Sequence, residues 1–162
     1  MSFWNSIKRL SIKQILQLTF VLMRRPLLIR PTLQATKQTM KICDSLYGKA
    51  HHKNGKANAF RHALWNIEIC KKSFGVTKNV DKSIYWAKKI TDLHEKMAPN
   101  ARLETAMDLH NNEIGRILFK SFFDQNESLI MDFIEKKAQK AQKLTKIEDI
   151  ENCKNELVYI SD

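Results

Sequence analysis

Glycine and proline, the residues that most often end helices, are scarce in this chain of 162 residues, with four glycines and three prolines. Nearly all of them fall between segments whose apolar residues recur every three or four positions, which is the spacing of an amphipathic helix. No segment alternates apolar and polar residues for long, as a half-buried strand would. Because 43% of the residues are hydrophobic and no linker is evident, we predict an all-α protein with a single compact multi-helix domain of about six helices.

The expected helices follow from these segments and from the residues at their ends. Residues Pro26–Pro31 are expected to form an extended connector, since residues before proline avoid the helical conformation. Leu157–Ile160 is the only β-like run and is too short to predict a sheet. The predicted helices cover about Phe3–Arg24, a segment from a Thr32 cap to near Gly48, Ala57–Phe74 ended by Gly75, a segment from an Asp81 cap to before Pro99, Asn100–Leu118, and a segment from Asn126 or Ser128 through Ala141.

The formal charge of +11 is concentrated at the N-terminus. Residues 1–56 contain 11 lysines and arginines but only one acid, whereas residues 117–162 contain slightly more acids than bases. We therefore divide the chain into basic N-terminal helices packed on the core (1–56), a helical core with a polar site (57–146) and a tail (147–162). The basic segment predicts attraction to an anionic membrane surface or to nucleic acid, with a protein partner as the alternative. A lysine-rich composition without any such partner would give the same imbalance.

The first residues superficially resemble a targeting signal. Residues 15–23 are apolar and follow a basic stretch, but Arg24-Arg25-Pro26 stands where a signal peptide has small residues at its cleavage site. The apolar run is also about half the length that spans a bilayer, which is roughly 20 residues. We therefore expect a cytoplasmic protein whose first helix packs on the domain or associates with a membrane surface.

Three of the expected helices carry dense polar groups within an otherwise apolar pattern. Residues three and four apart share one face of a helix, so these polar side chains can be aimed at a common point. The polar groups are Asn58, His62, Trp65 and Asn66 on the first helix, Thr91, His94 and Glu95 on the second, and Glu104, Asp108, Asn111 and Asn112 on the third. Gly115, inside the third helix, indicates a close approach by another backbone or by a ligand.

Three interpretations of these groups remain open. Together, His62, His94, Glu95 and Asp108 would form either a proton-transfer pair oriented by a carboxylate or a site for a divalent metal, the candidate cofactor. Alternatively, the buried polar side chains only satisfy one another's hydrogen bonds. His94-Glu95 lacks the second histidine of a zinc-protease helix, and no glycine-rich phosphate loop is present. The three cysteines are far apart and odd in number, so we expect them to be buried and reduced rather than to bind zinc.

The same residues resemble the pattern of an uncharacterised bacterial domain family. That pattern is an Asn-Ala-Phe-Arg-His-Ala-x-Trp block, a His-Glu pair and a Met-Asp-x-x-Asn-Asn-x-x-Gly block, in that order. Here the three parts are Asn58–Trp65, His94-Glu95 and Met107–Gly115. Related domains occur at the C-terminal ends of secreted polymorphic-toxin proteins, including those with Rhs-type repeats. The resemblance implies a helical domain that acts as a toxin-like effector enzyme.

The expected function is therefore that of a hydrolase or toxin-like effector domain acting on an anionic or phosphate-bearing substrate. The alternative is a non-catalytic helical module that docks on a membrane surface or a partner protein through its basic N-terminal helices. The expected catalytic residues are His62, His94, Glu95 and Asp108. The expected substrate-binding residues are Asn58, Arg61, Trp65, Asn111, Asn112 and Arg116. Outside this group, His51 and His52 lie in a basic loop and are expected to be exposed.

Overall fold

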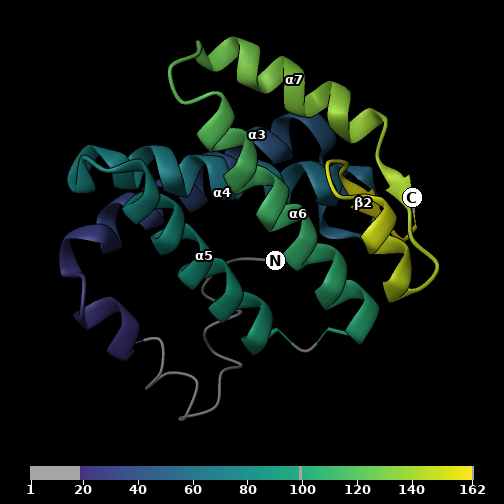
Figure 1. Ribbon diagram of the computed structural model, residues 1–162, viewed down its shortest axis with the longest axis horizontal. Helices are drawn as coiled ribbons and strands as arrows, with labels where there is room; N and C mark the ends of the chain where they lie inside the picture. The colour runs from purple at the N-terminus through teal and green to yellow at the C-terminus, as the bar shows by residue number, and fades with distance from the viewer. Residues whose placement is uncertain (1–18, 99, 162) are drawn as a thin grey trace.

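The computed structural model describes residues 19–98 and 100–161, and its helical content of 77% confirms the all-α prediction (Figure 1). The helix expected over Phe3–Arg24 lies mostly outside these residues, and positions 19–23 of it are helical. The long helices are α3 (Ile29–Tyr47), α4 (Lys56–Thr77), α5 (Val80–Met97), α6 (Arg102–Ser121) and α7 (Glu127–Gln139). The short elements are the 3-10 helices η1 (Pro26–Leu28), η2 (Ala50–His52) and η3 (Ile147–Asn152) and the strands β1 (Gln142–Lys143) and β2 (Val158–Tyr159).

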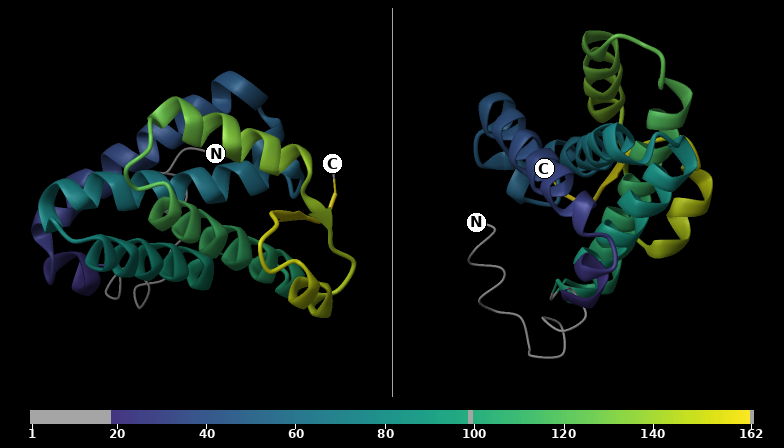
Figure 2. Two further views of the ribbon diagram at one scale, coloured as in Figure 1. Left: turned by 45° about the horizontal axis from the view of Figure 1, so that its top comes forward. Right: turned by 90° about the vertical axis from the view of Figure 1, so that its left-hand side faces the viewer.

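Helix α4 is the centre of the domain. It contacts α3, α5, α6 and α7 and lies among them in both views of Figure 2. Its apolar side chains are distributed around the helix, and Phe60, Leu64, Ile67 and Ile69 are all buried. A helix that is apolar on all sides is typical of a buried position, and each such side chain contributes about 1.5–3 kcal/mol. Several polar residues on α4 are therefore buried too, namely Asn58, His62, Asn66, Glu68 and Ser73.

Helices α4 and α6 approach each other most closely at Gly115. A Cβ atom added to Gly115 would lie 2.3 Å from the backbone oxygen of Ala63 and 2.8 Å from its Cα atom. This confirms the prediction that a neighbouring backbone requires a glycine at this position. The close approach holds the polar face of α6 against that of α4.

Several helix ends differ from the predicted ones. The prediction of an extended connector over Pro26–Pro31 is wrong, because this segment forms η1 and the first turn of α3. Proline is compatible with a first helical turn, where its missing N–H would have no helical acceptor. Helix α4 continues past Gly75 and ends at Lys78, which adopts a left-handed φ of 51°. The cap of α5 is Asn79 rather than Asp81.

The C-terminal segment is an integral part of the domain. Strands β1 and β2 pair in parallel, so the β-like run at Leu157–Ile160 does contain a short strand. Leu157 and Val158 are fully buried. The side chain of Asn111 on α6 donates to the carbonyl oxygen of Val158 at 2.8 Å and accepts from its N–H at 2.9 Å. Asn111 thus binds both backbone groups of Val158 to α6, and His110 on the same helix adds a hydrogen bond to the carbonyl oxygen of Glu156 at 2.8 Å.

We expect Asn111→Ala to release this segment, because the buried N–H and C=O groups of Val158 would both lose their partner. The free energy of unfolding should fall by about 2–4 kcal/mol. Limited proteolysis should cleave within residues 142–161 faster than in the wild type. Asn155→Ala, at an exposed position of the same segment, is the control and should not change cleavage. Equal rates of cleavage in the two variants would contradict a role of Asn111 in holding the C-terminal segment on the domain.

The three cysteines are confirmed as buried, unpaired thiols. They are Cys43, Cys70 and Cys153. Burial raises the pKa of Cys43 and of Cys70 to about 12. Because the thiolate is the reactive form, neither of these two residues is suited to act as a nucleophile.

Candidate active site

The side chains of His62, Glu95 and Asp108 come together from α4, α5 and α6. They are 2%, 1% and 5% exposed. Nε2 of His62 lies 3.3 Å from Oδ1 of Asp108, and Nδ1 of His62 lies 3.6 Å from Oε1 of Glu95. One potential ligand atom from each residue lies within 4.8 Å of the other two. The structure thus brings together three of the four residues predicted to be catalytic, and we call them the central cluster.

The neighbours of His62 place the imidazole hydrogen on Nδ1. The guanidinium of Arg61 donates to Nε2 at 2.8 Å, and since a guanidinium cannot accept a hydrogen bond, Nε2 carries a lone pair. Nδ1 then carries the hydrogen and donates to Oδ1 of Asn112 at 3.1 Å. Burial lowers the pKa of His62 well below its ordinary value, and the charge of Arg61 adds to this effect. The ring is therefore neutral at physiological pH and directs an unprotonated Nε2 toward Asp108.

Glu95 and Asp108 are buried carboxyl groups with incomplete hydrogen bonding. Oε1 of Glu95 accepts from Nδ2 of Asn112 at 3.0 Å. Oε2 of Glu95 and Oδ1 of Asp108 have no hydrogen-bond partner among the described residues. Burial raises the pKa of Glu95 to about 8 and that of Asp108 to about 7. Both groups therefore exchange protons near neutral pH, as general acids and bases do.

A hydrogen-bond network of buried side chains supports the central cluster. Nδ2 of Asn66 donates to Oδ1 of Asn112 at 2.7 Å. Oδ1 of Asn66 accepts from Arg116 at 3.0 Å and from the hydroxyl of Thr91 at 3.3 Å. The sequence-based set of site residues omits Asn66 and Thr91. The four-residue step from His62 to Asn66 is the signal that could have identified Asn66.

An open groove between α5 and α6 connects the central cluster with solvent. It has a volume of about 870 Å³, and Glu95 and Arg116 are among the residues that line it. Basic and acidic side chains contribute equally to its walls, so the groove itself has no strong excess of charge. The charged residues are Lys88, Lys96, Arg116 and Lys120 together with Asp81, Asp92, Glu95 and Glu113. Glu95 is the one member of the central cluster among the residues that line the groove.

The other predicted site residues lie around the central cluster rather than in it. The ring of His94 packs edge-on against Trp65, with 5.1 Å between centroids, and the residue remains exposed to solvent. The indole N–H of Trp65 donates to the hydroxyl of Thr36 on α3 at 2.9 Å. The side-chain nitrogen and oxygen of Asn111 both bind the C-terminal segment, as described above. Asn58, one turn before the cluster histidine on α4, is buried, and its Oδ1 has no partner within the described part of the chain.

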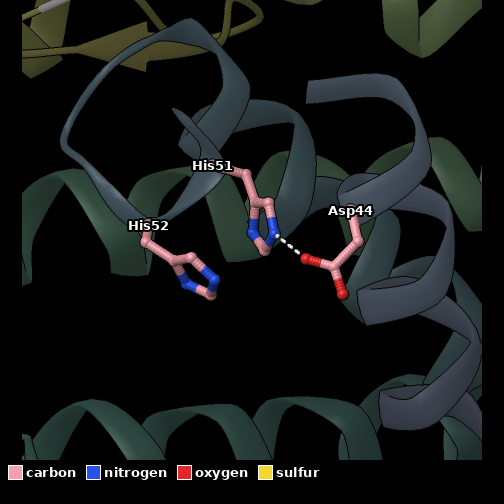
Figure 3. A group of neighbouring side chains, drawn as sticks. All are labelled: Asp44, His51 and His52. Atoms are coloured by element: carbon pink, nitrogen blue, oxygen red, sulfur yellow. Dashed lines mark hydrogen bonds and ion pairs between the residues drawn. The ribbon is translucent and has the colours of Figure 1, made fainter. Parts of the chain in front are cut away.

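A second group of titratable side chains lies where α3 ends and η2 follows (Figure 3). Nε2 of His51 donates to Oδ1 of Asp44 at 2.8 Å, which lowers the pKa of Asp44. His52 is exposed, as predicted, but the prediction that His51 is exposed is wrong, because its exposed fraction is 0%. The basic loop is folded into η2, which packs on α4, and Arg61 donates to the carbonyl oxygen of His51 at 2.6 Å. One potential ligand atom from each of the three residues lies within 4.8 Å of the others.

Comparison with known proteins identifies the domain that contains these residues. A protein-family model described as Domain of unknown function (DUF6973) matches residues 19–142, which include the whole central cluster. No curated protein and no solved structure matches the chain. Because the family model covers well over half of the sequence, this chain belongs to the DUF6973 family of domains of unknown function.

Proposed function

We propose that this protein is a hydrolase that acts as a toxin-like effector domain, with the central cluster as its active site. The observation that carries the proposal is the convergence of His62, Glu95 and Asp108 beside an open groove, with two carboxyl oxygens unpartnered among the described residues. A cluster that served only the fold would be expected to use these atoms, because a buried polar atom without a partner costs about 1–3 kcal/mol. A catalytic role is one explanation for buried polar atoms that have no hydrogen-bond partner.

The protonation states suit hydrolysis by general acid–base catalysis. The neutral Nε2 of His62 accepts a proton from an attacking water molecule, whose oxygen forms the new bond to the substrate. Asp108 or Glu95, each protonated in part near neutral pH, donates its proton to the leaving group as the old bond breaks. Water thereby supplies a hydroxyl group to one product and a proton to the enzyme. Arg61 and Arg116 favour an anionic or phosphate-bearing substrate, since a guanidinium binds paired oxygens and stabilises developing negative charge.

A substrate panel tests this function with the full chain. It should contain a phosphodiester, a phosphomonoester, a carboxylic ester and RNA. His62→Ala and Asp108→Asn should each lower kcat/KM on the preferred substrate by about 100- to 10,000-fold, which is the usual contribution of a general acid or base. His52→Ala, at an exposed histidine outside the central cluster, should retain the wild-type rate. Equal rates in the wild type and the His62 and Asp108 variants would contradict the proposal.

The toxin-like part of the proposal has its own support and its own test. It is supported by the resemblance of Asn58–Trp65, His94-Glu95 and Met107–Gly115 to the blocks of an uncharacterised bacterial domain family, since related domains occur at the C-terminal ends of polymorphic-toxin proteins. Inducible production of the wild type in a bacterial host should arrest growth, whereas Asp108→Asn at the same protein level should not. Growth arrest by both proteins, or by neither, would argue against an effector that depends on this active site.

A second candidate function, docking on an anionic membrane surface, is supported by the segment before α3. Phe20, Met23 and Leu27 are 58%, 73% and 75% exposed, and Arg24 and Arg25 lie between them in the sequence. Exposed apolar side chains flanked by arginines suit the interface of an anionic bilayer. Among the described residues, no helix has the length and apolar content needed to cross a membrane, so the proposed contact is with the surface.

Vesicle co-sedimentation tests this second function. The wild type should bind vesicles that contain phosphatidylserine, and the double variant Met23→Ser, Leu27→Ser should bind at least about five-fold less because it loses apolar surface. Leu129→Ser, at a 54% exposed leucine on α7, is the control and should bind like the wild type. Equal binding by all three proteins would exclude this segment as the docking surface.

A further inference from the structure

We infer that the central cluster binds a divalent transition-metal ion of the zinc or manganese type. This inference rests on the same site as the proposed hydrolase and specifies its cofactor; with the ion bound, Nε2 of His62 would be a ligand rather than the general base. The first support is that two lone pairs face each other in the cluster. Nε2 of His62 is an acceptor because Arg61 donates to it, and Oδ1 of Asp108, 3.3 Å away, has no hydrogen-bond donor among the described residues. A proton or a metal ion between the two atoms would stabilise such a close pair of acceptors.

The spacing of these two atoms fits a metal ion. Two ligand atoms about 2.1 Å from a tetrahedral zinc ion lie about 3.4 Å apart, which is close to the separation between His62 and Asp108. Glu95 supplies a third potential ligand within 4.8 Å, and its Oε2 is unpartnered within the described residues. The amide oxygen of Asn58, one turn before His62, is also buried and unpartnered there. One imidazole nitrogen with carboxylate and amide oxygens suits zinc or manganese.

The surroundings of His62 resemble the second shell of a metal site. A histidine that binds a metal through one nitrogen usually donates the other N–H to a fixed acceptor. Nδ1 of His62 donates in this way to Asn112, whose own amide donates to Glu95 and whose oxygen is also held by Asn66. This arrangement fixes the tautomer that leaves Nε2 available. It also connects two of the proposed ligands through a single amide group.

Charge provides a further argument. With both carboxyl groups bound to an ion as carboxylates, the cluster would hold two negative charges against the one positive charge of Arg61, its only cationic contact among the described residues. A divalent ion would convert this into a net positive charge, which suits the anionic substrate proposed above. Arg61 would have to release Nε2 of His62. Its other terminal nitrogen is held by the carbonyl oxygen of His51 at 2.6 Å and would keep the guanidinium beside the ion.

Metal titration of the full chain tests this inference. Protein stripped with a chelator is titrated with Zn²⁺ and, separately, with Mn²⁺, and the bound ion is measured after equilibrium dialysis. The wild type should bind one ion per chain, while Asp108→Asn and Glu95→Gln should weaken binding at least about 100-fold, because each removes a charged ligand. Asp44→Asn removes the carboxylate of the second group (Asp44, His51 and His52) and is the matched control. It should bind like the wild type.

The outcomes separate the metal site from the hydrolase. Loss of the ion in Asp44→Asn but not in Asp108→Asn would assign it to the second group and overturn the inference. If neither metal ion binds but hydrolysis depends on His62, the inference of a metal site is overturned and the proposed function is retained. One bound ion that is lost in Asp108→Asn, without hydrolysis of any panel substrate, would support the metal site and contradict the proposed function. If the cluster variants fail to fold, a Zn²⁺-induced rise in the melting temperature of Asp44→Asn supports the inference, and no rise overturns it.

Discussion

Gly115→Ala is expected to lower the free energy of unfolding by about 3 kcal/mol or more, the upper range for overpacking a core. The added methyl group would lie 2.3 Å from the backbone oxygen of Ala63, and a backbone atom cannot move aside as a flexible side chain can. Helices α4 and α6 would have to separate, which would also pull His62 away from Asp108. For a domain of this length the melting temperature should fall by about 10 °C, and calorimetry or circular dichroism would measure it.

Gly75→Ala is the matched control for this prediction. Gly75 also lies inside a helix, but a Cβ atom there would meet no other atom within 4 Å. Alanine favours the helix over glycine by about 0.5–1 kcal/mol, so this variant should be as stable as the wild type or more stable. Similar losses of stability in Gly75→Ala and Gly115→Ala would contradict a specific close approach at Gly115.

The stability of the metal-free protein is expected to fall as the pH rises from about 6.5 to about 8. In the folded state burial raises the pKa of Glu95 to about 8 and of Asp108 to about 7, above the ordinary values of 4.5 and 3.8 that apply in the unfolded chain. Over this range the folded protein holds more protons than the unfolded chain, so raising the pH favours unfolding. Below pH 6.5 an opposing effect begins, because burial lowers the pKa of His62 and protonation of its ring then favours the unfolded chain.

Amide substitutions test the origin of this pH dependence. Glu95→Gln and Asp108→Asn should each flatten the decline and should be at least as stable as the wild type at pH 8, because a neutral amide replaces a buried charge. Asp132→Asn, at an exposed carboxylate on α7, should keep the wild-type profile. Urea unfolding at several pH values in the presence of a chelator would measure these differences. A wild-type stability that rises between pH 6.5 and 8 would contradict the burial of ionisable carboxyl groups.

The helices could be predicted because their apolar spacing is dictated by burial, as for Ile84, Ala87 and Ile90 along one face of α5. The ends of the helices were less predictable, because the conformational preferences of single residues at those positions are weak. Pro31 loses no hydrogen bond in a first helical turn. Gly75 disfavours a helix by only about 1 kcal/mol, which packing elsewhere along α4 outweighs. Tertiary contacts, which the local sequence does not contain, therefore determine where these helices begin and end.

The candidate site was predictable within each helix but not between helices. A step of four residues places His62 and Asn66 on one face of α4, and the structure places both in the same network. The same reasoning could not choose between His94 and Glu95, because neighbouring residues point about 100° apart around a helix. The packing of α5 on α4 selects Glu95 for the central cluster and leaves His94 against an indole ring. Likewise, only the packing of η2 on α4 buries His51.

Long-range ¹H–¹⁵N NMR of the imidazole of His62 in metal-free protein at pH 7 is the decisive measurement for this cluster, with His62→Asn to assign the signals. We expect the hydrogen on Nδ1 and an unprotonated Nε2, because Arg61 donates to Nε2 and Asn112 accepts from Nδ1. One equivalent of Zn²⁺ should shift the Nε2 resonance strongly and leave the hydrogen on Nδ1. A doubly protonated ring at pH 7, or a hydrogen on Nε2, would contradict the facing lone pairs on which the active site and its metal ion depend.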